Sequence, residues 1–191
     1  MRARQNGIPG RILRLWLCIC LLLAVLAVFG VKSLGNIVSD FAFNAELPAE
    51  LQFDRLVVDK RARRLTAYAG GEAVREYRIA LGWAPEGHKQ MEGDGKTPEG
   101  IYFVDGKNPN SRYYKNLGVS YPNDDDRKAA AALEVSPGGE IKIHGLPPGQ
   151  EHLGGVHWLR DWTAGCIAVS NEEIDELYAR TPVGTPIEIR P

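Results

Sequence analysis

Two segments of this 191-residue chain indicate its fold and its chemistry: Ile141-Lys142-Ile143-His144-Gly145 and Thr163-Ala164-Gly165-Cys166-Ile167-Ala168-Val169. In the first segment apolar and polar residues alternate, which predicts a strand with one buried face that ends at His144. The second segment leads from a turn of small residues into an apolar strand, and Cys166 stands at the junction. A strand end is a rigid mount for a reactive side chain, so both segments are candidate parts of one active site.

Cys166 is the single thiol of the chain beyond its amino-terminal apolar segment, which holds Cys18 and Cys20. A free cysteine has a pKa near 8.5, so only about 3% is thiolate at neutral pH, and a nucleophilic thiol needs a base beside it. His144 is the best-placed candidate, because it ends a strand and because Gly145 permits a close approach of backbone or substrate. Small neighbours and backbone N–H groups around Cys166 leave room for a carbonyl and its oxyanion.

A zinc site is the main alternative to thiol chemistry. His144, His152, His157 and Cys166 offer three nitrogens and one sulfur, which is nominally sufficient for tetrahedral zinc. Their spacings of 8, 5 and 9 residues fit no compact ligand pattern, and a second cysteine that would anchor a knuckle is missing from this segment. We therefore predict no metal.

The amino-terminal region, residues 1–32, predicts a membrane signal. Leu15 to Val31 is uncharged and almost wholly apolar, and as a helix it would span roughly 25 Å, close to a hydrocarbon core of about 30 Å. Four arginines precede this segment, which places the amino terminus in the cytosol and exports the remainder. Its length favours a retained anchor over a cleaved signal peptide, although Ser33-Leu34-Gly35 is a weak cleavage candidate. The prediction is a periplasmic protein held at the inner membrane.

The balance of basic and acidic residues changes after the amino-terminal region. Residues 1–40 contain five basic residues against one acid, and the rest of the chain has 18 basic and 23 acidic side chains. The formal net charge of −1 gives no support to nucleic-acid binding, which would require a strongly basic domain. Residues 33–52 have the composition of a linker, and residues 53–191 then form one domain.

The residues after Phe53 form short β-type runs separated by turns. The runs at 56–58 and 65–68 predict a hairpin, and further strands are expected at 77–81, 101–104, 117–121, 141–144 and 186–189. The segment 82–100 is rich in glycine, proline and charge, which is typical of a long loop. Asn123 is expected to cap a helix that ends near Leu133, and Ser170 with Glu173 forms a capping box before a second helix. This order predicts one mostly β domain with two minor helices.

The segments 141–145 and 163–169 resemble motifs of the L,D-transpeptidase catalytic domain family, also called the YkuD domain. The family motif is a His-Gly at a strand end followed by Ser/Thr-His-Gly-Cys, and the chain has Ile143-His144-Gly145 and Thr163-Ala164-Gly165-Cys166. A second family signature, a Thr-Pro-x-Gly loop before a strand, is present at Thr97-Pro98-Glu99-Gly100. The resemblance covers roughly residues 54–190 and implies a β-sandwich.

The resemblance also implies a mechanism. Cys166 would be the nucleophile, His144 its base, the Gly145 carbonyl would orient the imidazole, and the N–H groups of Gly165 and Cys166 would hold the oxyanion. The implied substrate is the peptidoglycan stem peptide, attacked at its third residue (a diamino acid) with loss of the terminal D-alanine. An amine of a second stem would then resolve the thioacyl-enzyme, so the expected activity is L,D-transpeptidation without any cofactor.

Two departures from the family pattern leave alternatives open. The usual histidine two residues before the cysteine is Ala164 here, and the usual arginine or asparagine two residues after it is Ala168. A subgroup with similar Asp-Trp-Thr-x-Gly-Cys-Ile-Ala segments includes hydrolases of peptidoglycan crosslinks or of wall-attached proteins. An L,D-endopeptidase or carboxypeptidase, or a non-catalytic wall-binding module, are therefore the alternative functions.

The predicted substrate-binding residues lie before and within the cysteine motif. Asp161 and Trp162 are candidates for contact with the diamino acid or a glycan, and Thr163 belongs to the same group. His157 is a candidate for shaping the substrate groove, although a surface-loop role fits it equally well. Lys96 and Arg112 are candidate partners for a stem-peptide carboxylate.

Overall fold

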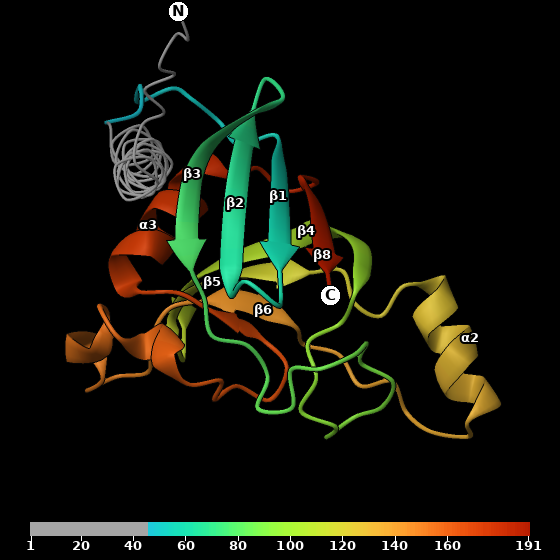
Figure 1. Cartoon of the computed structure of the whole chain (residues 1–191). Helices are drawn as coiled ribbons and strands as arrows, with labels where there is room; N and C mark the ends of the chain where they lie inside the picture. The colour runs from blue at the N-terminus through green and yellow to red at the C-terminus, as the bar shows by residue number, and fades with distance from the viewer. Residues whose placement is uncertain (1–45) are drawn as a thin grey trace, which may run out of the picture. The chain divides into compact units, whose positions relative to one another are not determined.

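The computed structural model describes residues 46–191 (Figure 1). The predicted membrane segment, residues 1–32, and the first part of the predicted linker lie outside the described residues. Within the described part of the chain, none of the helices has the length and apolar character needed to span a membrane.

The described residues form one mostly β fold with eight strands in the order β3-β2-β1-β8-β4-β5-β6-β7. The strands are β1 (Arg55–Asp59), β2 (Arg64–Ala69), β3 (Glu72–Arg78), β4 (Gly100–Ser111), β5 (Tyr114–Val119), β6 (Lys142–His144), β7 (Ile167–Ala168) and β8 (Pro186–Arg190). The predicted hairpin is confirmed as β1 and β2, which pair antiparallel. The closing strand is also confirmed, and β8 lies between β1, which runs parallel to it, and β4, which runs antiparallel.

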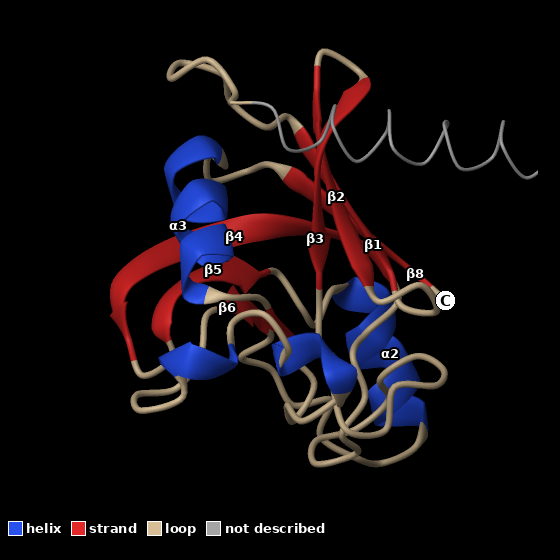
Figure 2. Ribbon diagram, turned by 60° about the vertical axis from the view of Figure 1, so that its left-hand side comes forward, coloured by secondary structure: helices blue, strands red, loops and turns tan. Residues whose placement is uncertain are grey.

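The sheet is continuous through β4, in place of the two separate sheets that a sandwich would have. β4 pairs with β8 at its start and with β5 along the rest of its length. In Figure 1, β1, β2 and β3 stand upright while β5 and β6 run across below them, and Figure 2 shows the same crossing from the side. The buried side chains of the two halves, together with those of α3 (Asn171–Arg180), form one hydrophobic core that includes Leu56, Leu65, Tyr102, Leu117, Ile143, Ile167 and Ile187.

Both predicted helices are confirmed with their caps. Asn123 caps α2 (Asp124–Ala132) by accepting from the N–H groups of Asp125 and Asp126. Ser170 and Glu173 form the predicted capping box of α3, in which each side chain accepts from the other residue's N–H. Because α3 follows β7 directly and packs against β5, this cap holds the segment that follows Cys166.

Two strand predictions need correction. The strand expected at 77–81 is β3, Glu72–Arg78, and the chain then leaves it to form an isolated bridge between Ala80 and Ala168. The strands expected at 101–104 and 117–121 belong to a much longer hairpin, β4 and β5, whose polar end reaches Ser111 and Tyr114. The sequence did not predict this extension because its residues are polar and include Pro109. The pairing of β4 with β5 also contains register shifts there.

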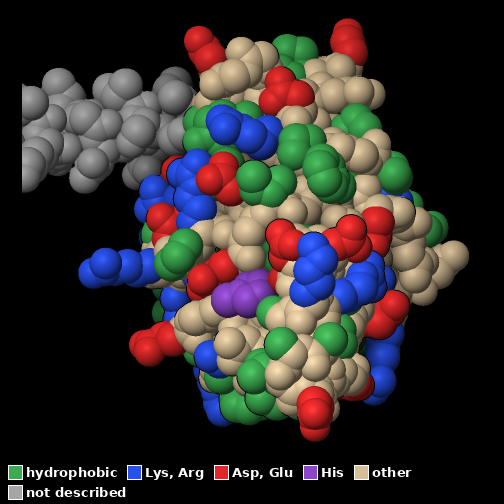
Figure 3. Space-filling view, turned by 90° about the vertical axis from the view of Figure 1, so that its right-hand side faces the viewer, with side chains coloured by type: hydrophobic (Ala, Val, Ile, Leu, Met, Phe, Trp, Pro, Cys, Tyr) green, Lys and Arg blue, Asp and Glu red, His purple; other side chains and the backbone are tan. Residues whose placement is uncertain are grey.

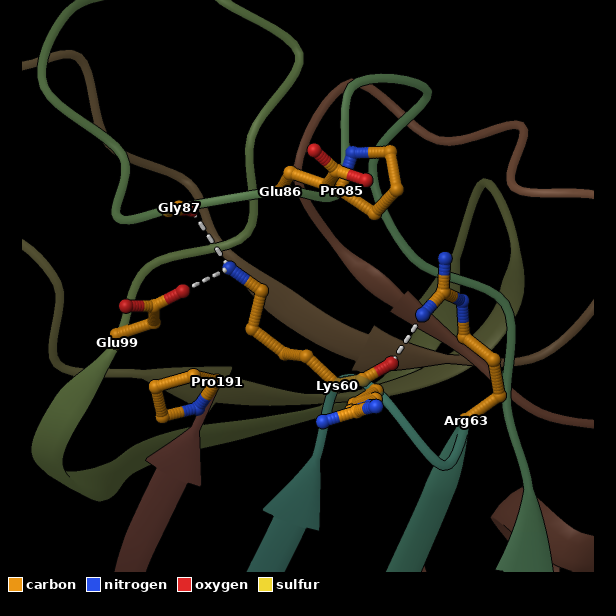
Figure 4. Close-up of a pocket in the computed structure, with 8 residues that line it drawn as sticks. Lys60, Arg63, Pro85, Glu86, Gly87, Glu99 and Pro191 are labelled. Atoms are coloured by element: carbon orange, nitrogen blue, oxygen red, sulfur yellow. Dashed lines mark hydrogen bonds and ion pairs between the residues drawn. The ribbon is translucent and has the colours of Figure 1, made fainter.

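The loop 82–100 is tied to the sheet by a buried lysine. Lys60 is 2% exposed, and its ammonium donates to the carbonyls of Gly87 (2.7 Å) and Thr97 (2.9 Å) and to the Glu99 carboxylate (2.7 Å) (Figure 4). Burial lowers the pKa of Lys60, against the opposing effect of its bond to Glu99. These three bonds satisfy a charge that would otherwise be buried alone, and they join β1 to both ends of the loop.

The far side of this loop is polar. Asp126 of α2 accepts from the Tyr102 hydroxyl (3.0 Å) and lies 3.0 Å from His88 Nε2, while His88 Nδ1 accepts from the Glu99 N–H (2.9 Å). On the face shown in Figure 3, acidic and basic side chains surround a histidine. This network links α2 to the loop 82–100.

Candidate active site

The thiol stands at the end of a turn that Thr163 holds closed. The Thr163 hydroxyl donates to the Cys166 carbonyl (2.7 Å) and accepts from the Gly165 N–H (3.1 Å). Its backbone pairs with the segment after β3: Thr163 N–H donates to Leu81 (3.1 Å), and Trp83 N–H donates to Thr163 (2.9 Å). Thr163 is 4% exposed, so its side chain lies beneath the turn and acts on the position of the thiol.

Gly165 is required by close backbone packing. Its φ is +131°, and a Cβ at this position would lie 2.6 Å from the Lys96 carbonyl oxygen. Thr97 follows on the same loop, is fully buried, and accepts from the Gly82 N–H (3.0 Å) through its hydroxyl. The Thr-Pro-x-Gly loop therefore forms the floor under the cysteine turn, which explains physically why the two motifs occur together.

Gly165→Ala is expected to lower the free energy of unfolding by about 2 kcal/mol or more, because the new Cβ meets backbone and because φ is unfavourable for alanine. Chemical denaturation of the full-length variant measures this change. Gly155→Ala is the matched control, since nothing lies within 4 Å of a Cβ there. Equal stability of the two variants would contradict the proposed packing.

His144 ends β6 and is 3% exposed. Its Nδ1 lies 2.7 Å from the Gly145 carbonyl oxygen. A carbonyl only accepts, so Nδ1 carries the proton and Nε2 of the neutral ring keeps a lone pair. Gly145 is also sterically required, since a Cβ there would lie 2.6 Å from Asn171 Oδ1. The Gly145 carbonyl thus orients the imidazole, and the role of His144 as base stays a prediction.

Two aromatic rings hold the imidazole. Tyr113, at the tip of the β4–β5 hairpin, stacks on His144 with ring centroids 4.5 Å apart and an interplanar angle of 28°. Trp162 meets the same imidazole edge-on at 5.7 Å and 66°. These contacts limit the rotation of the His144 side chain and exclude water from two of its sides. Trp162 therefore lies beside His144, and its contact with substrate stays a prediction.

Burial keeps both reactive groups neutral. It lowers the pKa of His144 to about 4, with only partial opposition from the Gly145 carbonyl. Burial also raises the pKa of the Cys166 thiol, although the Lys142 backbone N–H and its charge oppose the change. At neutral pH the pair is thus a thiol and a neutral imidazole, suited to transfer of the proton during attack on a substrate.

Cys166 and His144 line one cavity of about 390 Å³, whose other lining residues are mostly polar or charged. Lys142 and His144 are two residues apart on β6, so they share one face of the sheet, and His144 pairs with Ala168 on β7. The thiol lies 3.5 Å from the Glu140 carbonyl oxygen. The remaining lining residues come largely from the β4–β5 hairpin and are Asn108, Ser111, Arg112, Tyr113 and Asn116.

The other predicted site residues have partners within the fold. Asp161 accepts from Arg63 Nη2 (2.7 Å) and from the Leu81 N–H (2.9 Å), so it joins the loop before the thiol to the β1–β2 hairpin. His157 Nδ1 lies 2.7 Å from the Gly154 carbonyl, and its Nε2 lies 3.1 Å from the Arg78 carbonyl. Both ring nitrogens of His157 therefore face backbone carbonyl oxygens. Substrate contact by Asp161, Thr163 or His157 stays a prediction.

The predicted oxyanion hole also stays a prediction. The Gly165 N–H donates to the Thr163 hydroxyl, so it would have to exchange this bond to reach an oxyanion. Of the two alanines that depart from the family motif, Ala164 is exposed, whereas Ala168 is fully buried and bonded to Ala80 through both its N–H and its carbonyl.

Sequence reasoning missed Tyr113, Glu140 and Lys142. Lys142 was visible as a polar position two residues before His144 on an alternating strand, which is a usable signal. Tyr113 carried none, because the hairpin tip that brings it to His144 was not predicted as β structure.

A thiol and a neutral histidine that face one polar cavity are the parts that acyl transfer by a cysteine requires. The model of the L,D-transpeptidase catalytic domain (YkuD) matches residues 54–189, and the chain belongs to this family.

Relatives agree with this assignment. The chain is 37% identical over 95 residues to a protein named "Putative L,D-transpeptidase YafK" of Escherichia coli K12, a match over 48% of this chain and 30% of that protein. Among solved structures, the helical cell shape determining protein Pgp2 of Campylobacter jejuni is 25% identical with a TM-score of 0.54 over 79% of this chain and 54% of Pgp2. Bd1075 of Bdellovibrio bacteriovorus is 30% identical with a TM-score of 0.51, over 75% of this chain and 53% of Bd1075. The chain thus spans about half or less of these relatives.

Proposed function

We propose that this protein modifies peptidoglycan as an L,D-transpeptidase, through a thioacyl-enzyme formed on Cys166. The observation that carries the proposal is the joint placement of Cys166 and a neutral, oriented His144 in one polar cavity. Membership of the L,D-transpeptidase catalytic domain family supplies the substrate class, the stem peptide.

The reaction follows from the proton positions. His144 Nε2 takes the thiol proton as sulfur attacks the carbonyl carbon of the third stem residue, and the oxyanion is held by backbone N–H groups that include that of Cys166. The bond to the terminal D-alanine then breaks, and the imidazolium returns its proton to the leaving amine. An amine of a second stem attacks the thioester, loses a proton to His144, and releases the thiol with a new crosslink.

Hydrolysis is the second candidate, favoured by a specific observation. Position 164, where the family commonly has a histidine, is an exposed alanine, so one polar group that could bind an acceptor is missing beside the thiol. Water would then resolve the thioester, and the protein would act as an L,D-carboxypeptidase or endopeptidase. The relative Pgp2 is described as determining helical cell shape, and we propose an effect on cell shape for this protein as well.

The proposed location is the periplasm, at the inner membrane. Its support is the sequence alone: arginines precede the apolar segment Leu15 to Val31, and the catalytic domain follows it. Peptidoglycan lies in the same compartment, so the substrate and the proposed location agree.

Mass analysis of muropeptide products tests the proposal. The purified full-length chain is incubated with disaccharide-tetrapeptides and, separately, with crosslinked dimers. We expect tripeptide-containing dimers from the tetrapeptides, as transfer requires. Tripeptides alone would indicate carboxypeptidase action, and loss of the supplied dimers would indicate endopeptidase action. Unchanged substrates in both reactions would overturn the proposal and favour a wall-binding module.

A further inference from the structure

Part of the wall of the cavity that holds Cys166 and His144 is charged. Arg112 lies at the tip of the β4–β5 hairpin, and Lys142 and Glu140 flank Ile141 at the start of β6. All three line the cavity that holds Cys166 and His144. Two cations and one anion thus line the cavity in which the thiol would meet a substrate.

The charges are available to a ligand. Within residues 46–191 the Arg112 guanidinium forms no ion pair, and Arg112 is exposed at the cavity. Lys142 Nζ pairs with Glu140 Oε2 at 3.1 Å, but the Glu140 side chain is 90% exposed, so this pair can exchange partners readily.

Glu140 is held in an unusual backbone conformation at this point. Its φ is +58°, in the left-handed region that non-glycine residues seldom adopt, and it follows Gly138 and Gly139. Its carbonyl oxygen lies 3.5 Å from the thiol sulfur. This backbone sets the Glu140 carboxylate and the thiol on the same short segment of the cavity wall, and strain of this kind commonly persists at functional positions.

We infer that Arg112, Lys142 and Glu140 form a subsite for a zwitterionic amino-acid head, with a carboxylate on Arg112 and Lys142 and an ammonium on Glu140. On binding, the ligand carboxylate replaces Glu140 at Lys142 while the ligand ammonium neutralises Glu140, so no charge is left unpaired. Before binding, Arg112 has no ion pair within residues 46–191, so the three residues carry a net positive charge that attracts an anionic peptide. This inference rests on the proposed function, because the diamino acid of a stem peptide carries such a head at the end of its side chain.

The subsite makes Arg112, Lys142 and Glu140 determinants of specificity. They select a stem whose third residue ends in both an amine and a carboxylate, and they discriminate against stems that end in an amine alone. Charge-assisted hydrogen bonds of this kind are worth about 10- to 100-fold in affinity when one partner is removed.

Binding to full-length Cys166→Ala, measured by calorimetry, tests the inference independently of turnover. The probes are a stem tetrapeptide with diaminopimelate third and D-alanine fourth, and three analogues that are amidated at the side-chain carboxylate, acetylated at the side-chain amine, or amidated at the terminal alanine. We expect the first two modifications to weaken binding about 10-fold or more, and the third to have a smaller effect.

Variants then assign each charge. Adding Arg112→Gln should weaken binding of the unmodified peptide about 10-fold and reduce the penalty for side-chain amidation, because Lys142 alone then holds the carboxylate, while Glu140→Gln should abolish the penalty for acetylation. Arg61→Gln, an exposed arginine outside this cavity, is the matched control. The inference is overturned if the variants weaken all four peptides equally, or if terminal amidation is the change that removes the Arg112 effect.

Failure of this subsite is distinguishable from failure of the proposed function. A protein that processes muropeptides but binds all four peptides equally keeps its proposed function and lacks the subsite. A protein that binds the peptides as expected but leaves muropeptides unchanged has the subsite without the proposed reaction. Absence of peptide binding overturns the inference.

Discussion

Cys166→Ala is expected to lower kcat/KM on muropeptides by roughly 10⁴-fold or more, because Cys166 is the single thiol of residues 46–191 that could form the thioester. The sulfur is positioned by the Thr163 turn and by the floor of the Thr97 loop, neither of which contacts the deleted atom through a side-chain bond. The variant should therefore remain folded, and turnover of disaccharide-tetrapeptides by the full-length chain measures the loss.

A second readout separates chemistry from binding. Intact-mass analysis after incubation with a carbapenem should show a stable adduct on the parent protein and none on Cys166→Ala. Ala164→Ser is a useful control, since position 164 is exposed beside the thiol and its change should leave adduct formation in place. Full muropeptide turnover by Cys166→Ala would disprove the proposed mechanism.

His144→Gln is expected to reduce kcat/KM by about 10²- to 10⁴-fold, the usual contribution of a general base. The parent protein should also show an unusual pH profile. Burial lowers the pKa of His144 to about 4, so the base stays unprotonated at pH 5, where an ordinary histidine would be almost fully charged. Because burial raises the pKa of Cys166, we expect a plateau of kcat/KM from above pH 4 to beyond pH 9.

Stability provides an independent check on the same group. Between its unfolded pKa of 6.5 and its folded pKa of about 4, His144 is protonated in the unfolded chain and neutral in the folded one. The free energy of unfolding should therefore have its highest value above pH 6.5, as far as His144 is concerned. It should fall by on the order of 3 kcal/mol as the pH drops toward 4. His144→Gln should remove this pH dependence of stability, while His152→Gln, which changes an exposed histidine, should not.

The pH profile of kcat/KM has a contrary outcome as well. A narrow bell-shaped profile centred near neutrality would indicate a thiolate–imidazolium pair in place of the neutral pair.

Local patterns in the sequence predicted the elements whose causes are local. The alternating strand before His144, the Asn123 cap and the Ser170–Glu173 capping box were all recovered, because each depends on residues a few positions apart. The β4–β5 hairpin was underestimated, since its polar half pairs through irregular register and through contacts that only the assembled sheet supplies.

The sequence by itself determined which residues are proposed to react: a lone thiol beyond the apolar segment and a histidine at a strand end, both within the glycine motifs of the family. The tertiary structure decided what surrounds that pair. It brings Tyr113 onto His144, buries His144, leaves Cys166 half-buried, and places Arg112, Lys142 and Glu140 in the lining of the same cavity. The physical reason is that bonding patterns along the chain are short-range, whereas burial and the meeting of charges depend on segments that are distant in sequence.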